Sequence, residues 1–223
     1  MTHAHEHAPI PVMPDAKPVS TWTMLVTLGG SGSIVGLAIV LIYMWTLPPI
    51  ERYKAKVLRE AIAEVLHDPA RCDTLFLANG ALVNKRPAGD PDVPMERVFI
   101  GYRADSTPVG YAIATTEVGF SDPIEMLVGY EPTSKTLLGL KILVSKETPG
   151  IADKIEKPAF LTQFAKAVAP LVGVKNTAAA GPNNVTMISG ATISSRAVIR
   201  GINRAIERWQ PLLDTYAAQH GRN

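Results

Sequence analysis

One long apolar segment dominates the hydropathy pattern of the chain. No charged residue occurs within residues 18–50, and a helix through this segment would cross about 30 Å of hydrocarbon. Aromatic residues, whose rings favour the membrane interface, lie near both ends: Trp22, Tyr43 and Trp45. The pattern therefore predicts a transmembrane helix over residues 21–48, which Pro48-Pro49 is expected to end.

A cleaved signal peptide is the alternative interpretation of this segment. The segment is longer than the apolar core of a signal peptide, and residues 1–20 before it lack a basic region. We therefore expect a retained anchor behind a flexible tail of residues 1–20. Gly32 and Gly36 share one face of the predicted helix, which favours close packing against other membrane helices.

After the apolar segment the pattern becomes that of a mixed α and β domain. Apolar residues recur at helical spacing over 50–66 and predict a linking helix over 49–69, ended by His67-Asp68-Pro69. Residues 70–100 read as irregular, because prolines interrupt their short apolar runs.

Short apolar runs then predict two pairs of strands. Residues 98–103 and 109–114 flank a turn at 105–108, and residues 125–130 and 137–144 form the second pair. Their order along the chain predicts an antiparallel meander.

Two further segments have the apolar spacing of helices. They cover residues 160–169 and 192–209, and Pro211 is expected to limit the second. The predicted fold class is α+β: a twisted antiparallel sheet with packed helices, within a domain of residues 70–223, preceded by one transmembrane helix.

Composition narrows the possible functions. Hydrophobic residues make up 47% of the chain, which allows a real core, and the net charge of +2 gives no reason to expect nucleic acid. The single Cys72 leaves no thiolate set for zinc or an iron–sulfur cluster and reads as a small buried apolar residue. His3, His5 and His7 read as part of a solvated tail, so no metal site is expected.

The most informative chemistry lies at the start of the last predicted helix. Residues 189–195 read Ser-Gly-Ala-Thr-Ile-Ser-Ser, and they place hydroxyls and unpaired backbone N–H groups at a helix N-terminus. Such an end suits a phosphate, because the positive pole of the helix dipole lies there. The alternative is an ordinary helix cap, for which serine and threonine are common.

This motif resembles the FMN-binding domain of the G subunit of Rnf electron-transport complexes and of the C subunit of the sodium-pumping NADH:quinone reductase. Residues 146–155, Lys-Glu-Thr-Pro-Gly-Ile-Ala-Asp-Lys-Ile, resemble a second block of that family. The resemblance covers roughly residues 50–215. It implies that a flavin transferase joins the phosphate of FMN to Thr192 as a phosphoester.

The resemblance also implies roles for the neighbouring residues. Those expected around the phosphate are Ser189, Gly190, Ala191, Ile193, Ser194 and Ser195. Glu147, Thr148 and Gly150 are expected in a loop against the flavin ring, with Thr148 bonding its heteroatoms and Glu147 orienting the loop or the ribityl chain. Arg196 and Arg200 follow on the next turn, either as phosphate partners or as solvated surface charges.

Two positions depart from the family pattern. The family has an acidic residue three positions before the serine of the attachment motif, where this chain has Thr186. Ala152 stands where the family has the second glycine of its Pro-Gly-x-Gly turn, and we expect the turn to survive this change.

The function implied is that of an electron-transfer subunit rather than a stand-alone catalyst. No catalytic residues are expected, because the sequence shows neither a nucleophile–base pair nor a nicotinamide-binding glycine fingerprint. The resemblance implies an Rnf-like ion-translocating ferredoxin:NAD oxidoreductase complex, with integral membrane subunits and neighbouring flavin, iron–sulfur or haem centres as partners. The alternatives are an unflavinylated structural or regulatory subunit and an FMN-dependent reductase of a periplasmic acceptor.

The charge pattern and the family resemblance predict opposite sides of the membrane for the C-terminal domain. Basic residues follow the apolar segment at 52–59, whereas Lys17 alone precedes it, besides histidines, and this pattern favours a cytoplasmic domain. The family places its domain on the periplasmic side of the inner membrane, where the flavin transferase acts. We follow the family and expect a single-pass inner-membrane protein with a periplasmic C-terminal domain.

Overall fold

The structure, a computed structural model, describes residues 20–88, 95–175 and 181–220. The chain divides into two compact units, residues 1–52 and 53–223, which are described separately. The predicted tail of residues 1–20 and its histidines lie outside the described residues except for Ser20.

Helix α1 (Thr21–Val65) begins at the residue predicted to start the transmembrane helix. An 18-residue window of it has a mean hydropathy of 2.2 and is not buried by the protein, so α1 is a candidate membrane span. The predicted end at Pro48-Pro49 is wrong, because the helix continues through both prolines. Proline φ fits a helix, and the bonds of the neighbouring turns maintain a helix that loses single N–H donors.

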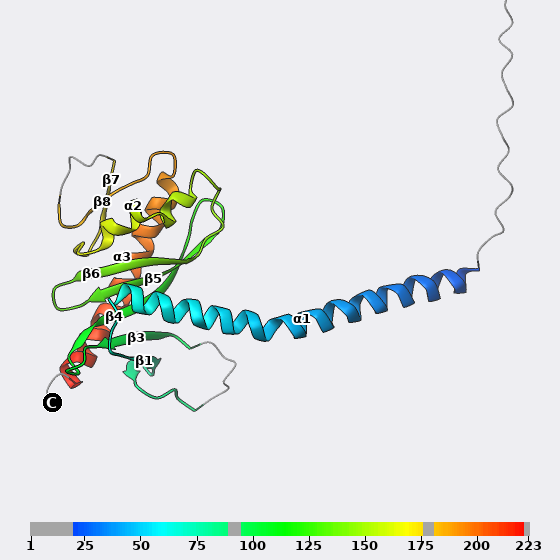
Figure 1. The fold of residues 1–223 in the computed structure, drawn as a ribbon, viewed down its shortest axis with the longest axis horizontal. Helices are drawn as coiled ribbons and strands as arrows, with labels where there is room; N and C mark the ends of the chain where they lie inside the picture. Colours follow the sequence, from blue (N-terminus) through cyan, green and yellow to red (C-terminus); the bar gives the residue numbers. More distant parts are fainter. Residues whose placement is uncertain (1–19, 89–94, 176–180, 221–223) are drawn as a thin grey trace, which may run out of the picture. The chain divides into compact units, whose positions relative to one another are not determined.

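Six antiparallel strands form the main sheet, in the order β2-β1-β3-β4-β5-β6 (Figure 1). Their bounds are β1 Arg71–Ala78, β2 Ala81–Val83, β3 Arg97–Tyr102, β4 Pro108–Val118, β5 Pro123–Glu131 and β6 Thr136–Val144. The α+β class and both predicted strand pairs are confirmed, with Ile113 opposite Val98 and Val128 opposite Leu140.

The irregular interpretation of residues 70–100 is wrong over much of its length. Strands β1 and β2 pair across Asn79-Gly80, whose φ angles are 50° and 78°. Positive φ at both central residues matches the twist of a two-residue hairpin, and Asn-Gly is the dipeptide that adopts it most easily. The hairpin signal was present in the sequence, but the prolines that follow it masked it.

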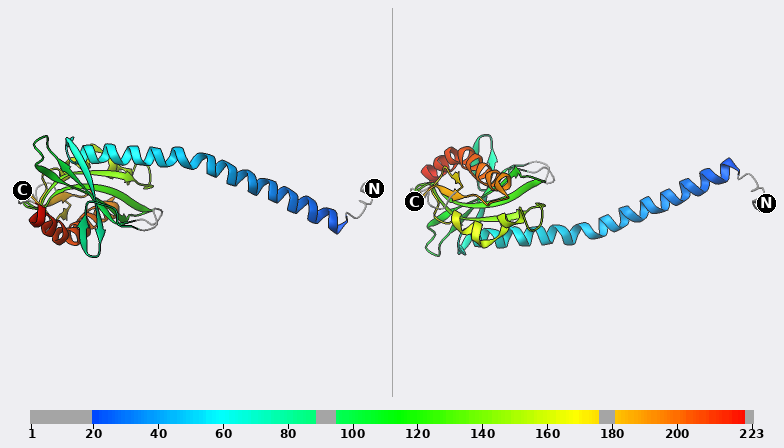
Figure 2. Two further views of the ribbon diagram at one scale, coloured as in Figure 1. Left: turned by 90° about the horizontal axis from the view of Figure 1, so that it is seen from below. Right: turned by 90° about the horizontal axis from the view of Figure 1, so that it is seen from above.

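Both faces of the sheet are covered within residues 53–223. One face packs against helix α3 (Thr192–His220), in a core that includes Ile113, Val128 and Ile202. The opposite face packs against the last turns of α1 through Ala61, Ile62 and Val65. Figure 2 shows the sheet between these two helices. Burial on both faces explains why the strands read as continuous apolar runs.

Two helix predictions need correction. Residues 160–169 hold only α2 (Pro158–Leu161) and the 3-10 turn η2 (Thr162–Phe164), after the 3-10 turn η1 (Asp153–Glu156). The chain leaves the helix because residues 166 and 167 exchange backbone hydrogen bonds with Leu137 at the β6 edge.

Helix α3 continues past Pro211 to His220, so the predicted limit at Pro211 is also wrong. Leu213 and Tyr216 extend the buried face of α3 beyond the proline, and their burial favours continuing the helix. A short parallel pair, β7 (Val172–Val174) with β8 (Asn184–Thr186), completes the described structure before α3. Cys72, expected to be buried, is exposed on β1, because its position lies on the less covered end of that strand.

The end of α1 lies very close to the sheet at Gly129 and Gly139, which face each other across β5 and β6. A Cβ added at Gly129 would overlap the backbone carbonyl of Val65, whereas a Cβ at Gly139 would lie 3.5 Å from the Cα of Val65, an ordinary contact. Glycine at position 129 is therefore required for helix and strand to approach.

We predict that Gly129→Ala destabilises the domain by about 1–3 kcal/mol, because backbone atoms must move apart. Gly139→Ala is the matched control and should change the free energy of unfolding by less than about 1 kcal/mol. The measurement is urea denaturation of the full chain in detergent, followed by the fluorescence of the buried Trp209 after Trp22 and Trp45 are replaced by phenylalanine. Equal effects of the two variants would contradict the packing argument.

Candidate functional site

The segment predicted to hold a phosphate forms a tight turn leading into α3. Gly190 has φ +83°, and the N–H of Ala191 donates to the carbonyl of Ile188 at 3.1 Å. The first backbone bond of the helix runs from the N–H of Ser195 to the carbonyl of Ala191 at 3.0 Å. Glycine suits position 190 because other residues adopt this left-handed conformation only with strain.

The two serines after Thr192 have structural partners. The Ser195 hydroxyl donates to the carbonyl of Ala191 at 2.9 Å and accepts the N–H of Ile188 at 3.1 Å. The Ser194 hydroxyl donates to Oε2 of Glu147 at 3.0 Å. Both side chains are buried. Their hydroxyl protons are thus used within the protein, and the expected place of these residues around a phosphate stays a prediction.

Thr192 differs from both serines. It is half-buried at the first position of α3, and its hydroxyl has no hydrogen-bond partner within residues 20–88, 95–175 and 181–220. The backbone N–H groups of residues 192–194 precede the first intrahelical bond and so remain available as donors. Ser189 and Gly190 are exposed beside them, and Ala191 is buried. This arrangement can bind a phosphate through backbone donors and present one free hydroxyl next to it.

A buried carboxylate joins this turn to two other segments. Glu147 accepts the N–H of Phe120 at 2.8 Å and the N–H of Ser121 at 3.3 Å, in addition to the Ser194 hydroxyl. A Cβ at position 119 would overlap Oε1 of Glu147, so Gly119 allows the approach. Sequence reasoning missed positions 119–121, because they lie far from both motifs along the chain and nothing local marks them.

The loop after Glu147 forms the turn that was expected to survive. The carbonyl of Thr148 accepts the N–H groups of Ile151 at 3.3 Å and Ala152 at 3.0 Å. Gly150 takes φ +78°, whereas Ala152 has φ −93° and ψ −17°, a right-handed conformation open to alanine. The second glycine is therefore unnecessary here. The side chain of Thr148 is exposed on the outside of the turn.

The arginines after the motif have different environments. Arg200 pairs with the buried Glu117 at 3.0 Å and donates to the carbonyl of Val118, and Arg204 pairs with the same carboxylate at 2.7 Å. Arg200 is thus committed to the end of β4 rather than to a phosphate. Arg196 is exposed and has no charged partner among the described residues.

Position 186, where the family has an acidic residue, lies in β8. Its N–H donates to Oε1 of Gln163 at 2.8 Å, and its carbonyl accepts from Nε2 of the same side chain at 3.3 Å. Gln163 therefore holds the backbone of Thr186, whatever side chain position 186 carries.

Exposed apolar side chains gather around these segments. Beyond α1, the exposed large apolar residues of the described chain are Val118, Phe120, Val144, Ile151, Val172 and Ile193. All but Val172 lie at the end of β4, in the β4–β5 turn, in the segment around Glu147 or at the start of α3. A concentration of exposed apolar side chains on a globular domain is typical of a surface that binds a protein, a membrane or a ligand.

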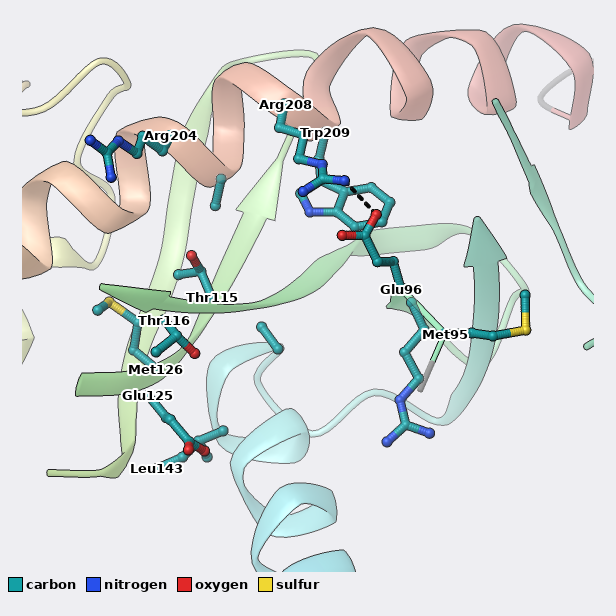
Figure 3. A pocket seen from close by; sticks show the side chains of 13 residues that line it. Met95, Glu96, Thr115, Thr116, Glu125, Met126, Leu143, Arg204, Arg208 and Trp209 are labelled. Carbon is teal, nitrogen blue, oxygen red and sulfur yellow. Dashed lines mark hydrogen bonds and ion pairs between the residues drawn. The ribbon is translucent and has the colours of Figure 1, made fainter. Parts of the chain in front are cut away.

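A separate cavity of about 490 Å³ lies where β4 runs past the start of β3 (Figure 3). Its charged lining is largely neutralised internally, since Arg208 pairs with Glu96 and Arg204 with Glu117. No residue of the two sequence motifs lines it. In the described part of the chain, no three His, Cys, Asp or Glu side chains gather in a way that would hold a metal ion.

Comparison with known proteins agrees with these motifs. Residues 119–207 match the FMN-binding domain family, a range that includes Gly119, Glu147 and Thr192. The G subunit of an ion-translocating oxidoreductase complex from Methanosarcina acetivorans is 27% identical over 195 residues, which cover 87% of this chain and 96% of that protein.

A second relative is the G subunit of the Na(+)-translocating ferredoxin:NAD(+) oxidoreductase complex of Acetobacterium woodii. It is 34% identical over 119 residues, or 52% of this chain and 56% of that protein, so the match spans about half its length. The crystal structure of Shewanella oneidensis NqrC has the same fold, with a TM-score of 0.59, 17% identity, and coverage of 74% of this chain and 99% of that one.

Gly119 lies too close to the Glu147 carboxylate to carry a side chain without strain. Gly119→Ala should destabilise the domain by about 1–3 kcal/mol, because the new methyl group displaces the Glu147 carboxylate and lies within 3.0 Å of the carbonyl of Asp122. The measurement is a double-mutant cycle with Glu147→Ala, using urea denaturation of the full chain. The alanine at 119 should be less costly once the carboxylate is gone, and strict additivity would contradict the contact.

Proposed function

We propose that this chain, whose residues 119–207 belong to the FMN-binding domain family, is the membrane-anchored, FMN-carrying subunit of an Rnf-type ion-translocating redox complex. We further propose that the FMN phosphate is joined covalently to Thr192. One observation carries the second part: the Thr192 hydroxyl is the one hydroxyl of the half-buried first turn of α3 that has no partner in the described chain, and it lies beside free N–H donors.

The residues present fit a phosphodiester. A phosphate esterified at both sides keeps one negative charge, which the N–H groups of residues 192–194 and the positive end of α3 would stabilise. The turn needs no side chain at Gly190, where nothing lies within 4 Å of an added Cβ, so there is room beside the threonine. Arg196 adds a positive charge on the next turn.

Attachment would form a bond between phosphorus and Oγ1 of Thr192. The bond broken is that between the same phosphorus and a leaving group on the flavin donor, and the hydroxyl proton is released. An anhydride such as that of a flavin dinucleotide supplies a suitable leaving group, and the flavin transferase supplies the catalysis. The chain itself contributes the exposed acceptor and the fixed turn that presents it.

The apolar surface beside the turn suits a flavin ring. Phe120, Ile151 and Ile193 are exposed in three segments that the Glu147 carboxylate joins, and a planar aromatic ring would bury such side chains. When bound, FMN supplies reversible electron-transfer chemistry, and the protein sets its orientation and surroundings. An electron relay of this kind requires neighbouring redox centres on other subunits.

The apolar half of α1 provides the membrane anchor in this proposal. We propose a single-pass protein of the inner membrane with residues 70–223 as the FMN-binding domain on the periplasmic side. Integral membrane subunits would pack against the helix surface that holds Gly32 and Gly36, where an added Cβ would meet nothing of the described chain within 4 Å.

Intact-mass and peptide mass spectrometry test the attachment. The full chain co-expressed with an active flavin transferase should carry the mass of FMN less one water on Thr192. Thr192→Ala should abolish the adduct and Ser189→Ala should leave it, whereas Thr192→Ser, which keeps a hydroxyl, should retain at least part of it. An unmodified Thr192 under these conditions would overturn the covalent proposal and favour an unflavinylated structural subunit.

A further inference from the structure

The carboxylate of Glu147 joins three segments that are distant in sequence. Its donors are two backbone N–H groups of the β4–β5 turn, at Phe120 and Ser121, and the hydroxyl of Ser194 in the first turn of α3. Its own N–H donates to the hydroxyl of Ser145 at 3.3 Å, which fixes the start of the loop that continues to Gly150. One side chain therefore sets the spacing between the loop and the helix.

Because the Glu147 carboxylate is buried, it needs hydrogen-bond donors around it. Glu147 is 5% exposed, and burying a carboxylate is unfavourable unless donors surround it. All three neighbouring polar groups are donors, as an ionised carboxylate requires. Both backbone N–H groups bond Oε1, whereas the Ser194 hydroxyl bonds Oε2, so each oxygen of the carboxylate holds a different element.

Ser194 lies two residues after Thr192 on α3. Ser194 is buried and faces the carboxylate, whereas Thr192 is half-buried with a free hydroxyl. Residues two apart on a helix point in nearly opposite directions. The Ser194 bond therefore holds the first turn of α3 from the inside while Thr192 remains accessible from the outside.

We propose that Glu147 is a positioning residue for the flavin: it fixes the attachment turn of α3 against the loop of residues 148–151, and so fixes the ring held between them. This rests on the proposed function at Thr192. Of the two expected roles of Glu147, orienting the loop or the ribityl chain, the proposal keeps the first, and the contacts that support it are with donors of the protein. Its negative charge lies beside the ring-binding segments and disfavours the addition of electrons to the ring.

The test uses the full chain carrying the FMN adduct, in detergent. Ser194→Ala removes the bond to α3 and leaves the carboxylate its two backbone donors. Glu147→Gln keeps the shape and removes the charge. The readouts are the fluorescence anisotropy and visible circular dichroism of the flavin, which report its freedom, and its midpoint potential.

A matched control exists elsewhere in the domain. Glu131 also accepts two backbone N–H groups, from Thr133 at 2.9 Å and Ser134 at 2.7 Å, and the hydroxyl of Ser134. It holds the β5–β6 turn and belongs to neither motif. Glu131→Gln and Ser134→Ala therefore make the same chemical changes to a carboxylate junction that the proposal does not place at the flavin.

Ser194→Ala should lower the flavin anisotropy and weaken its visible circular dichroism, and Glu147→Gln should shift the midpoint potential to more positive values. The two control variants should change neither. If adduct-bearing Ser194→Ala and Glu147→Gln proteins keep the wild-type anisotropy, dichroism and potential, Glu147 is only a structural residue and the inference is wrong. A chain with no adduct at all fails the proposed function instead, so the two failures are distinguishable by mass.

Discussion

Burial of the central sheet on both faces is the constraint on which the domain depends. Strands β3 to β6 present apolar side chains alternately to α3 and to the last turns of α1, so neither helix can leave without exposing a core. The cluster on the α3 side is the larger, and it includes residues from β1, β6 and the segment after η2. This packing fixes the axis of α3 and therefore the place of its N-terminus, where the candidate site lies. The position of Thr192, and with it the proposed attachment, thus depends on side chains several turns away.

Within that frame, polar contacts complete the site. Arg200 and Arg204 hold the end of β4 to α3 through Glu117, and Glu147 holds the following turn to the first turn of the same helix. The β4–β5 turn is thereby fastened to α3 at two points. The backbone of the exposed Phe120 in this turn is held by Glu147. Its apolar side chain therefore projects from a fixed position and not from a free loop.

The sequence predicted the parts of this structure that local patterns control. The β3–β4 and β5–β6 hairpins and the amphipathic face of α3 followed from periodicity and turn residues, and the tight turn at Gly190 followed from the motif. The hairpin of β1 and β2 was missed although its Asn-Gly signal is local. Two other failures have a common cause in tertiary packing. The burial of Leu213 and Tyr216 extends α3 through Pro211, and the free edge of β6 recruits residues 166 and 167 out of a helix. Local helix propensity contains no information about either of these tertiary contacts.

At the candidate site, too, the sequence predicted the local features and missed the long-range contacts. The motif placed Thr192 and its backbone donors correctly at the start of a helix, because those properties lie within a few consecutive residues. The motif did not reveal that Ser194 and Ser195 are internally bonded, since their partners depend on a buried carboxylate and on the returning carbonyl of Ala191. The partners of Glu147 lie 26, 27 and 47 residues away. Long-range hydrogen bonds of this kind leave no periodic signal.

Thr186 takes no part in the turn before Thr192. The turn that presents Thr192 is built by the φ of Gly190 and by the two bonds of the Ser195 hydroxyl, none of which involves position 186. The backbone of position 186 is held by Gln163 through its N–H and carbonyl, which any residue other than proline supplies in the same way. Threonine in place of an acidic side chain therefore leaves these contacts of the turn before Thr192 intact. What it alters is the charge at position 186, so in the proposed attachment its effect would fall on recognition by the transferase rather than on the fold.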